Sequence, residues 1–530
     1  MSPEKNNLYK FMKASDHIPP LSKKQLFAFF AMIVGMFMAV LDIQIVASSL
    51  SVIAAGLSAS SDELSWVQTS YLIAEVIIIP MTGFTARVLS TRISYFIAAL
   101  GFTIMSMLCS LAWNIESMII FRALQGFFGG AMIPTVFGVI YIIFPREKRP
   151  LVTIVIGLVV TVAPTLGPTI GGYITEILSW HFMFLLNVIP GIFVCVVVFL
   201  YADFDKPNYN LLKNFDWVGI ITLASTFGSL QYILEEGNQK GWLEDNILLL
   251  LTIVVIIGFF VLIIRELTFI NPILDFTIFI NKDFTFGCIY SFITGVGLYG
   301  AVYLLPLFLF TIAGFNTIQI GFTMMVTGLA QFCSAPIVGK MSGTGMDLRI
   351  MLALGLGLFG LGCYANSFLT PDATFWEFFL PQMIRGSALM FCFIPTNNIA
   401  LGTVSKDKVQ NASGLYNLTR NLGGAIGLAI IGSTISSKTK VFTQYMNENI
   451  SSTDPYVIEQ IDNYIQLLTG KIADPQAGAY LLLSNVVNKN AFVMSINYVF
   501  VTISFLFFAS MVVLPFLSNV KTSSEGGNAH

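Results

Sequence analysis

Charged side chains are scarce in this sequence. Asp, Glu, Lys and Arg make up 11% of its 530 residues, whereas they make up about a quarter of a soluble protein. The formal net charge is −2, so we expect no basic surface suited to nucleic acid. Only three histidines occur, and there is no Walker A motif. We therefore predict no metal site, no cofactor, no catalytic residue and no ATP-driven pump.

Cysteine is also rare. All six cysteines lie in apolar segments, which is typical of small buried hydrophobic residues rather than of a disulfide framework. We expect no disulfide-stapled domain.

Apolar residues make up 55% of the chain and form long uninterrupted segments. The hydrocarbon core of a bilayer is about 30 Å thick and needs about 20 apolar residues per helix. That window predicts fourteen transmembrane helices, near 26–52, 64–86, 92–113, 117–143, 150–173, 181–202, 216–236, 246–268, 284–311, 319–341, 349–368, 378–402, 410–436 and 491–517. The first apolar segment is too long for the core of a signal peptide, so we interpret it as an uncleaved span. The predicted fold class is an all-α polytopic membrane protein.

The basic residues predict the orientation. Both tails and the loops that join even-numbered to odd-numbered spans contain many Lys and Arg residues, whereas the short loops on the other side contain only Lys240. Basic residues of short loops stay on the cytoplasmic side. The sequence therefore places both termini in the cytoplasm.

One outer loop, 437–490, is long. Asp454 and Pro455 form a helix start signal, and apolar residues then recur at helical spacing up to Leu468. We expect an amphipathic helix that lies on the outer leaflet or on the protein. A role in docking a partner is the alternative interpretation.

Two distant segments resemble each other. Residues 125–135 read QGFFGGAMIPT and residues 385–396 read RGSALMFCFIPT. A short basic loop follows each, and 19 residues separate Lys148 from Gly167 and Lys408 from Gly427. The first six and last six spans therefore look like two copies with spans seven and eight inserted between them; chance similarity of glycine-rich apolar helices is the alternative. Parallel six-span repeats with a midplane site between them are a transporter architecture.

Four short motifs carry a more specific resemblance. Residues 41–46 read LDIQIV, residues 122–126 read RALQG, residues 167–172 read GPTIGG and residues 180–191 read WHFMFLLNVIPG. They are similar to the LDxTIV, RxxQG, GPxxGG and WRWxFxINVPxG motifs of the 14-span drug:proton antiporters of the major facilitator superfamily, the EmrB/QacA-like exporters. Two motifs depart from the family. After the second span, where the family has GxLADRxGRR, the sequence reads GFTARVLSTR, with Arg87 in place of the aspartate. In the span-six motif, His181 replaces the usual arginine.

The resemblance implies a major facilitator fold in the inner (cytoplasmic) membrane of a bacterium. Its expected parts are a cytoplasmic tail 1–25, a six-helix bundle 26–202, two inserted helices with a linker 203–268, a second bundle 284–517 that includes the outer loop, and a tail 518–530. The implied activity is proton-coupled export of amphipathic or cationic drugs and toxic organic compounds. The implied partners are small molecules, protons, the lipid bilayer and an EmrA-like periplasmic adaptor with an outer-membrane channel.

Several polar residues fall inside the predicted spans, where a charge costs about 2.5–3.5 kcal/mol and normally faces a cavity or a partner. Asp42 and Arg122 lie in the quoted motifs, and Glu75 lies at the middle of the second span. We predict these three as the proton-coupling residues; a structural ion pair is the alternative. The candidates for the substrate cavity are Glu75, Gln125, Arg385, Asn397 and Arg420.

The fifth span combines glycines with prolines. Its antiporter-motif residues are Ala163, Pro164, Gly167, Pro168, Gly171 and Gly172. Small residues at every fourth position allow helices to approach closely in lipid. We expect a bent, glycine-faced helix that packs against the other half and seals the cavity.

Two other functions compete with drug export. A dedicated exporter of a siderophore, a lipid or another metabolite has the same motifs. A membrane-bound enzyme or a passive channel needs no antiporter motif. Flux against a gradient that collapses with a protonophore separates a transporter from a channel.

Overall fold

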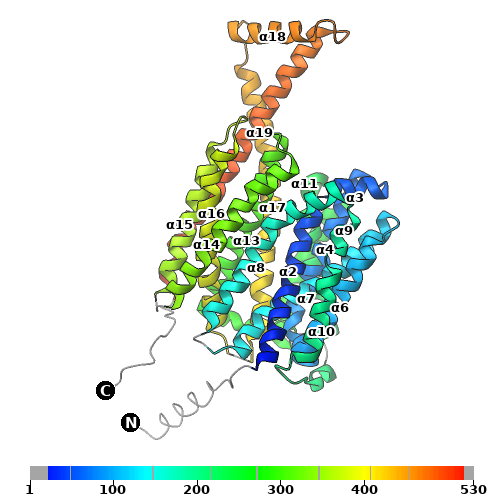
Figure 1. Ribbon diagram of the computed structural model, residues 1–530, viewed down its shortest axis with the longest axis vertical. Helices are drawn as coiled ribbons and strands as arrows, with labels where there is room; N and C mark the ends of the chain where they lie inside the picture. The colour runs from blue at the N-terminus through cyan, green and yellow to red at the C-terminus, as the bar shows by residue number, and fades with distance from the viewer. Residues whose placement is uncertain are drawn as a thin grey trace.

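The computed structural model describes residues 22–517, apart from residues 48, 146–147, 215, 270–271, 344–345, 406 and 452. Most of the predicted tail 1–25 and all of the tail 518–530 lie outside the described residues. The described elements are helices, arranged as two bundles side by side (Figure 1). This confirms the predicted all-α fold.

The first bundle contains the predicted spans one to six. Its long helices are α2 (Lys23–Ala47), α4 (Ser61–Ile78), α6 (Thr91–Ser110), α7 (Ile115–Ile143), α8 (Arg149–Ile177) and α10 (Val188–Tyr201). Helix α4 continues through a short 3-10 turn into α5 (Thr82–Leu89). Two short helices, α3 (Leu50–Leu57) and α9 (His181–Leu185), lie at the end of the bundle opposite the termini (Figure 1).

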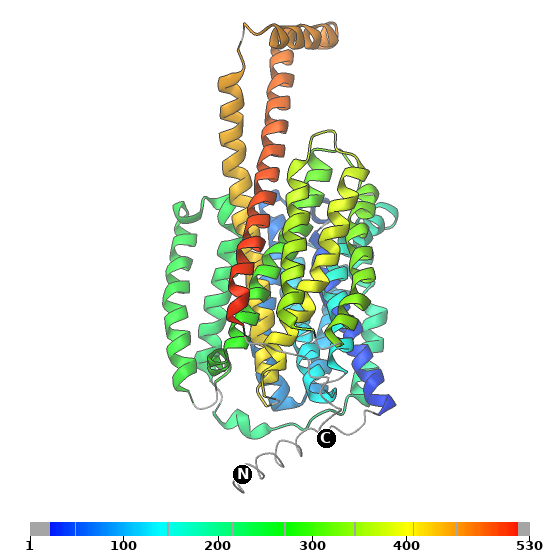
Figure 2. The same cartoon turned by 90° about the vertical axis from the view of Figure 1, so that its left-hand side faces the viewer.

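The inserted helices and the second bundle follow. The inserted helices are α11 (Trp217–Lys240) and α12 (Asn246–Thr268). The second bundle consists of α13 (Lys282–Thr311), α14 (Thr317–Gly343), α15 (Leu348–Ala365), α16 (Phe375–Gly402), α17 (Val409–Asn449) and α19 (Pro475–Ser510). Helix α12 packs on α11 and stands at the edge of the molecule (Figure 2).

Thirteen of the described helical segments are long and apolar enough to cross a membrane. Helix α17, which contains the predicted span 410–436, is not among them because its first half is rich in Asn, Gln and Arg. These polar residues are buried, and α17 packs along α13 inside the bundle. With α17, the arrangement corresponds to the fourteen predicted spans.

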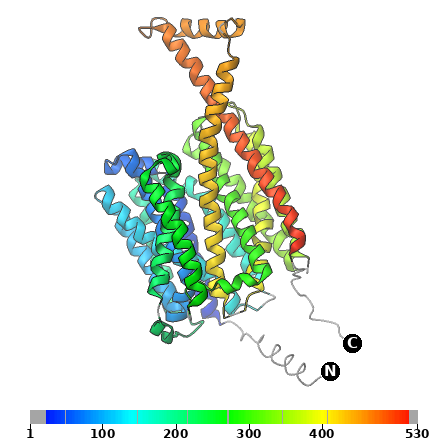
Figure 3. The ribbon, with the colours of Figure 1, turned by 180° about the vertical axis from the view of Figure 1, so that it is seen from behind.

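Most of the described part of the outer segment 437–490 is helical. Helix α17 continues to Asn449 and α19 begins at Pro475, so both project beyond the bundle (Figure 3). The predicted amphipathic helix is α18 (Pro455–Leu468), and the Asp454 carboxylate caps it by accepting from the Tyr456 N–H at 2.9 Å. Helix α18 lies across the far ends of α17 and α19, away from the bundle rather than on its surface (Figure 1).

Close contacts at glycines reveal the internal repeat. A Cβ added to Gly126 of α7 would lie 2.3 Å from the Tyr71 carbonyl oxygen of α4, and one added to Gly386 of α16 would lie 2.4 Å from the Thr327 carbonyl oxygen of α14. These helix pairs take the same places in the two halves. The similarity of the two sequence segments therefore reflects a structural repeat, not chance.

A second pair of glycines fixes the register of the repeat. Gly167 of α8 packs against Gln44 of α2, and Gly427 of α17 packs against Val296 of α13. Gln44 and Val296 are therefore counterparts, and so are Asp42 and Thr294, which lie two residues earlier.

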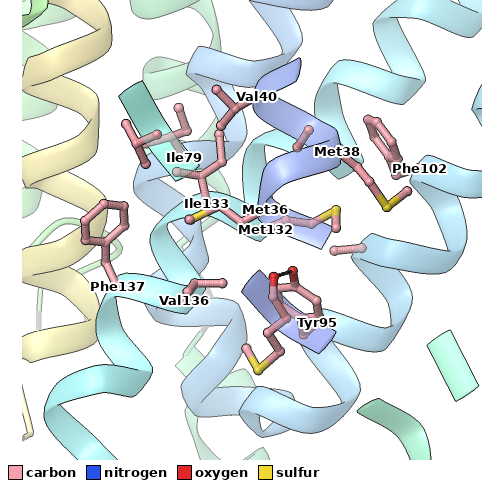
Figure 4. Packing of buried hydrophobic residues seen from close by; sticks show 14 of the residues in the cluster. Met36, Met38, Val40, Ile79, Tyr95, Phe102, Met132, Ile133, Val136 and Phe137 are labelled. Carbon is pink, nitrogen blue, oxygen red and sulfur yellow. Dashed lines mark hydrogen bonds between the residues drawn. The ribbon is translucent and has the colours of Figure 1, made fainter. Parts of the chain in front are cut away.

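The core of the first bundle is packed between α2, α6 and α7. Met36, Met38, Phe102 and Met132 fill it, and the Tyr95 hydroxyl donates to the Met32 carbonyl at 2.6 Å (Figure 4). Such close packing leaves little freedom for a polar side chain on these helices. It holds the charged residues of α2 and α7 in fixed positions.

Candidate functional site

A buried polar network surrounds Asp42 in the first bundle. Arg122 Nη1 lies 2.6 Å from Asp42 Oδ2, and Asp42 Oδ1 accepts from Gln125 Nε2 at 3.1 Å and from Asn187 Nδ2 at 2.7 Å. Gln125 Nε2 also donates to Ser106 Oγ at 2.7 Å. Asp42 is 1% exposed and Arg122 is fully buried. The network thus joins α2, α6, α7 and the residue that precedes α10 within one half.

Arg122 has further partners that hold its guanidinium in place. Its Nε donates to the Val67 carbonyl at 3.2 Å, and its Cζ lies over the Tyr71 ring, 4.3 Å from the ring centre. The planar guanidinium of arginine can form hydrogen bonds and lie on an aromatic ring at the same time, which the ammonium group of lysine does less well. Removal of Asp42 would leave this cation without its anionic partner.

The structure places Gln125 in this network and not between the halves. The sequence had suggested Gln125 as a substrate-cavity residue, but it is fully buried against Asp42, Arg122 and Ser106. The reason is the helical period: Gln125 lies three residues after Arg122 and shares its face of α7. Gln125 therefore belongs with Asp42.

Glu75 lies elsewhere, at the boundary between the halves. It is 1% exposed, and its Oε1 accepts from Asn421 Nδ2 of α17 at 3.1 Å. A cavity of about 60 Å³ adjoins both residues, and helices α2, α4, α11, α13 and α17 line it. Asp42 does not line this cavity, although Gln44 does. Of the three predicted proton-coupling residues, Asp42 and Arg122 therefore lie in the buried network, and Glu75 lies at the cavity.

Asn397 and Arg420 also lie where the halves meet. The Tyr141 hydroxyl of α7 donates to Asn397 Oδ1 of α16 at 2.8 Å. The Arg420 guanidinium donates to Asn417 and lies over the rings of Phe137 and Phe393, one from each half. Both residues therefore join the two halves.

Arg385 lies inside the second bundle. Its guanidinium donates to Gln382, whose Oε1 also accepts from Thr327 Oγ1 at 3.0 Å. Arg385 is 1% exposed, it forms no ion pair with the described residues, and its Nη1 has no hydrogen-bond partner among them. The structure does not place Arg385 on the cavity beside Glu75.

The antiporter-motif helix α8 is continuous through Pro164 and Pro168. Its glycine contact differs from the prediction: a Cβ on Gly167 would lie 2.4 Å from Gln44 Cβ of α2, in the same half. The contact with the other half uses glycines of α14 instead, with Gly321 against Thr169 and Gly339 against Ile154. Helix α8 thus packs between α2 and α14. Ala163, Gly171 and Gly172 are buried as well.

The bundle end near the termini is held together by a different acid. The Thr91 hydroxyl donates to Asp205 Oδ2 at 2.8 Å and accepts from Gln410 Nε2 of α17 at 3.1 Å. Burial raises the pKa of the Asp205 carboxyl. Arg87, which stands where the family has aspartate, donates from Nε to the Gly83 carbonyl at 3.3 Å. Asp205 of the linker therefore supplies a carboxylate near the altered motif.

Sequence reasoning missed several residues of these sites, among them Asn187, Gln231 and Glu235. Asn187 lies in the quoted WHFMFLLNVIPG motif, so a signal for it was present. Gln231 and Glu235 of α11 line the cavity beside Glu75; the only signal was the adjacent acids Glu235 and Glu236 at the end of the predicted span 216–236. Within the described residues, no group of three or more His, Cys, Asp or Glu could hold a metal ion.

Comparisons with known proteins agree with this arrangement. The model of the Major Facilitator Superfamily matches residues 32–428. The colistin resistance protein EmrB of Acinetobacter baumannii is 42% identical over 453 residues, which cover 86% of this chain and 88% of that protein. The multidrug export protein EmrB of Haemophilus influenzae is 28% identical over 92% of this chain and 94% of its own length. The fatty acid resistance protein FarB of Neisseria gonorrhoeae is 27% identical over 94% and 96%.

A solved structure shares the fold. The human organic anion transporter MFSD10 (TETRAN) aligns with a TM-score of 0.57 over 94% of this chain and all of that chain, at 11% sequence identity. The match extends over both bundles.

Proposed function

This chain belongs to the major facilitator superfamily, and we propose that it is a proton-coupled exporter of amphipathic or cationic toxic organic compounds in a bacterial inner membrane. The names of its relatives, which refer to multidrug export and to resistance against colistin and fatty acids, support export of foreign or toxic molecules. The excess of basic residues in the loops on the side of the termini supports a cytoplasmic location for both termini.

The observation that carries the proposal is the position of Glu75. An acid that is 1% exposed lies beside a cavity between two repeats and is held by Asn421 of the opposite repeat. In transporters with repeats, the site at their interface is exposed alternately to the two sides as the repeats rock. An acid at that place can exchange a proton for a substrate during the movement.

Asp42 and Arg122 are proposed as the second part of the coupling machinery. A buried ion pair is held by hydrogen bonds in this conformation, and protonation of Asp42 would break its attraction to Arg122. Asp42 lies on α2 and Arg122 on α7, and Gln44, two residues after Asp42 on α2, lines the cavity. Protonation of Asp42 could thereby change the packing at the cavity wall.

The proposal is tested with purified protein in liposomes. An imposed pH gradient should drive accumulation of ethidium, and a protonophore should abolish it. A panel with a fatty acid and a neutral dye distinguishes a broad exporter from one dedicated to a lipid or another metabolite. Ethidium flux that does not depend on the pH gradient would contradict proton coupling.

An adaptor protein with an outer-membrane channel is proposed as a partner on the basis of the family resemblance. The projecting segment formed by α17, α18 and α19 lies on the side opposite the termini (Figure 1). Co-purification of the chain with an EmrA-like adaptor from the same bacterium, compared with a chain that lacks 451–472, tests this assignment. Equal recovery of the adaptor with both chains would contradict docking at this segment.

A further inference from the structure

The inserted helix α11 is not a spacer on the lipid side. It packs against α4 of the first bundle and α17 of the second bundle, as well as against α12. The rings of Trp66 and Tyr232 lie 5.2 Å apart across the contact between α4 and α11. In the most apolar part of helix α12, by contrast, only 17% of the residues are buried. Of the two inserted helices, α11 is the one that reaches the interior.

Helix α11 contributes polar side chains to the cavity beside Glu75. The polar residues that line this cavity of about 60 Å³ include Gln68, Glu75, Gln231, Glu235, Tyr299 and Asn421. Gln68 lies seven residues before Glu75 on α4, a distance of about 10 Å along a helix. Glu235 lies at the same end of the bundle as Gln68, because α4 starts there and α11 ends there (Figure 1). Glu75 and Glu235 both line this one cavity.

Neither acid has a cationic partner in the described part of the chain. Glu235 Oε1 accepts from Gln231 Nε2 at 3.0 Å, and Glu75 accepts from Asn421. The basic groups nearby have other contacts: Arg122 pairs with Asp42, Arg420 donates to Asn417, and Lys240 lies 3.9 Å from Glu236. The cavity is thus lined by two carboxyl groups that have no cation of the described residues within ion-pair distance.

A buried hydrogen-bond acceptor on Gln231 also indicates that a ligand binds in this cavity. Gln231 is 2% exposed and lines the cavity, and its Oε1 has no hydrogen-bond partner among the described residues. A buried acceptor without a partner costs free energy, and so does a charged carboxylate in the membrane interior. A ligand with a positive charge and N–H donors offsets both costs. A neutral apolar ligand offsets neither.

We propose that Glu235 of the inserted helix joins Glu75 in binding the cationic nitrogen group of exported organic compounds. This inference rests on the proposed function only in taking the cavity beside Glu75 as the transport site. The cavity accepts a few water molecules or a small cationic group, whereas a drug-sized ligand needs about 300–1,000 Å³. The remainder of the molecule is therefore accommodated when the halves move apart.

The test is direct binding, which needs no gradient. Ethidium is titrated onto the purified chain in lipid nanodiscs, and its Kd is compared for the wild type, Glu235→Gln, Glu235→Asp and Glu236→Gln. Glu235→Gln should raise the Kd about tenfold, because a charge-assisted contact is lost. Glu235→Asp should bind more tightly than Glu235→Gln, because it keeps the charge. Glu236→Gln, an identical change one residue further along α11, should stay within about twofold of the wild type.

A neutral probe separates binding from structure. Binding of the uncharged dye N-phenyl-1-naphthylamine should be the same in wild type and Glu235→Gln, whereas a distorted cavity would weaken both probes alike. Equal ethidium Kd values for wild type and Glu235→Gln, or equal loss of both probes, would overturn the inference. Absence of pH-driven transport by a wild type that binds ethidium through Glu235 would instead refute the proposed function and leave the site in place.

Discussion

Both halves of the molecule bury an arginine and a glutamine three residues apart, on α7 and on its counterpart α16. In the first half the order is Arg122 and then Gln125; in the second half it is Gln382 and then Arg385. Arg122 has Asp42 as its partner at 2.6 Å. At the position that corresponds to Asp42, the second half has Thr294, whose hydroxyl donates to the Tyr290 carbonyl at 2.7 Å. Arg385 consequently forms no ion pair with the described residues.

This difference shows how a repeat can become functionally asymmetric. The packing of the two halves remains equivalent at the glycine contacts. The difference is one acid: Arg122 is neutralised by Asp42, whereas Arg385 forms no ion pair within the described part of the chain. A buried charge costs less when it is paired and hydrogen-bonded. The first half therefore pairs its buried arginine with an acid, whereas Arg385 forms no ion pair with the described residues of the second half.

The largest effect is expected when the acid of the first half is removed. Asp42→Asn keeps the shape of the side chain but makes the first half resemble the second, with an unpaired arginine. We expect loss of proton-driven efflux in liposomes, with the protein still inserted. Thr294→Val, at the corresponding position, is the matched control and should transport normally. Continued accumulation of substrate by Asp42→Asn on a pH gradient would show that Asp42 is not the required proton carrier.

A slightly smaller loss is expected from changes at the paired glycines. In Gly167→Val the new side chain would collide with Gln44 of α2, two residues from Asp42. We expect most of the transport to be lost and the proton leak to rise, whereas Gly427→Val against Val296 should affect folding more than leak. Gly328→Ala, whose Cβ would lie 3.9 Å from Thr165, is the control. Normal efflux without added leak in Gly167→Val would mean that this contact is no seal.

The two arginines should also differ in their contribution to stability. Arg122→Met leaves Asp42 buried without its cation, which costs about 3–5 kcal/mol. Arg385→Met leaves no acid unpaired, so we expect a change within about 1 kcal/mol, or stabilisation. The melting temperature of each variant in detergent, compared with that of the wild type, measures the change in stability. Similar losses for the two would contradict the idea that only Arg122 depends on an ion pair.

A selective loss is expected at Glu75, the acid on the boundary between the halves. Glu75→Gln retains the hydrogen bond to Asn421 but removes the charge, so export of cationic compounds should fall several-fold more than export of neutral ones. Initial rates for ethidium and for a neutral dye in the same vesicles provide the measurement. If both rates fall equally, Glu75 serves the fold or the coupling instead of substrate selection.

Much of this protein was determined by its sequence alone. Long apolar segments in a chain with few charges cannot be kept soluble, so the helical membrane fold and its spans follow from the hydrophobic thickness of the bilayer. The similarity of segments 125–135 and 385–396 also indicated the internal repeat. The motif residues Asp42 and Arg122 were recognisable because charges inside spans are rare.

Only the tertiary structure decided how the polar residues are grouped. Gln125 and Glu75 both lie inside predicted spans, but the rotation of each helix directs one to Asp42 and the other to the boundary with α17. The same applies to Gly167, which faces α2 of its own half and not the other half. An all-round apolar helix has no hydrophobic stripe from which its orientation can be read. The side chains that meet are therefore fixed by packing between helices distant in sequence, which explains why Glu235 of an inserted span was not predicted to share a cavity with Glu75.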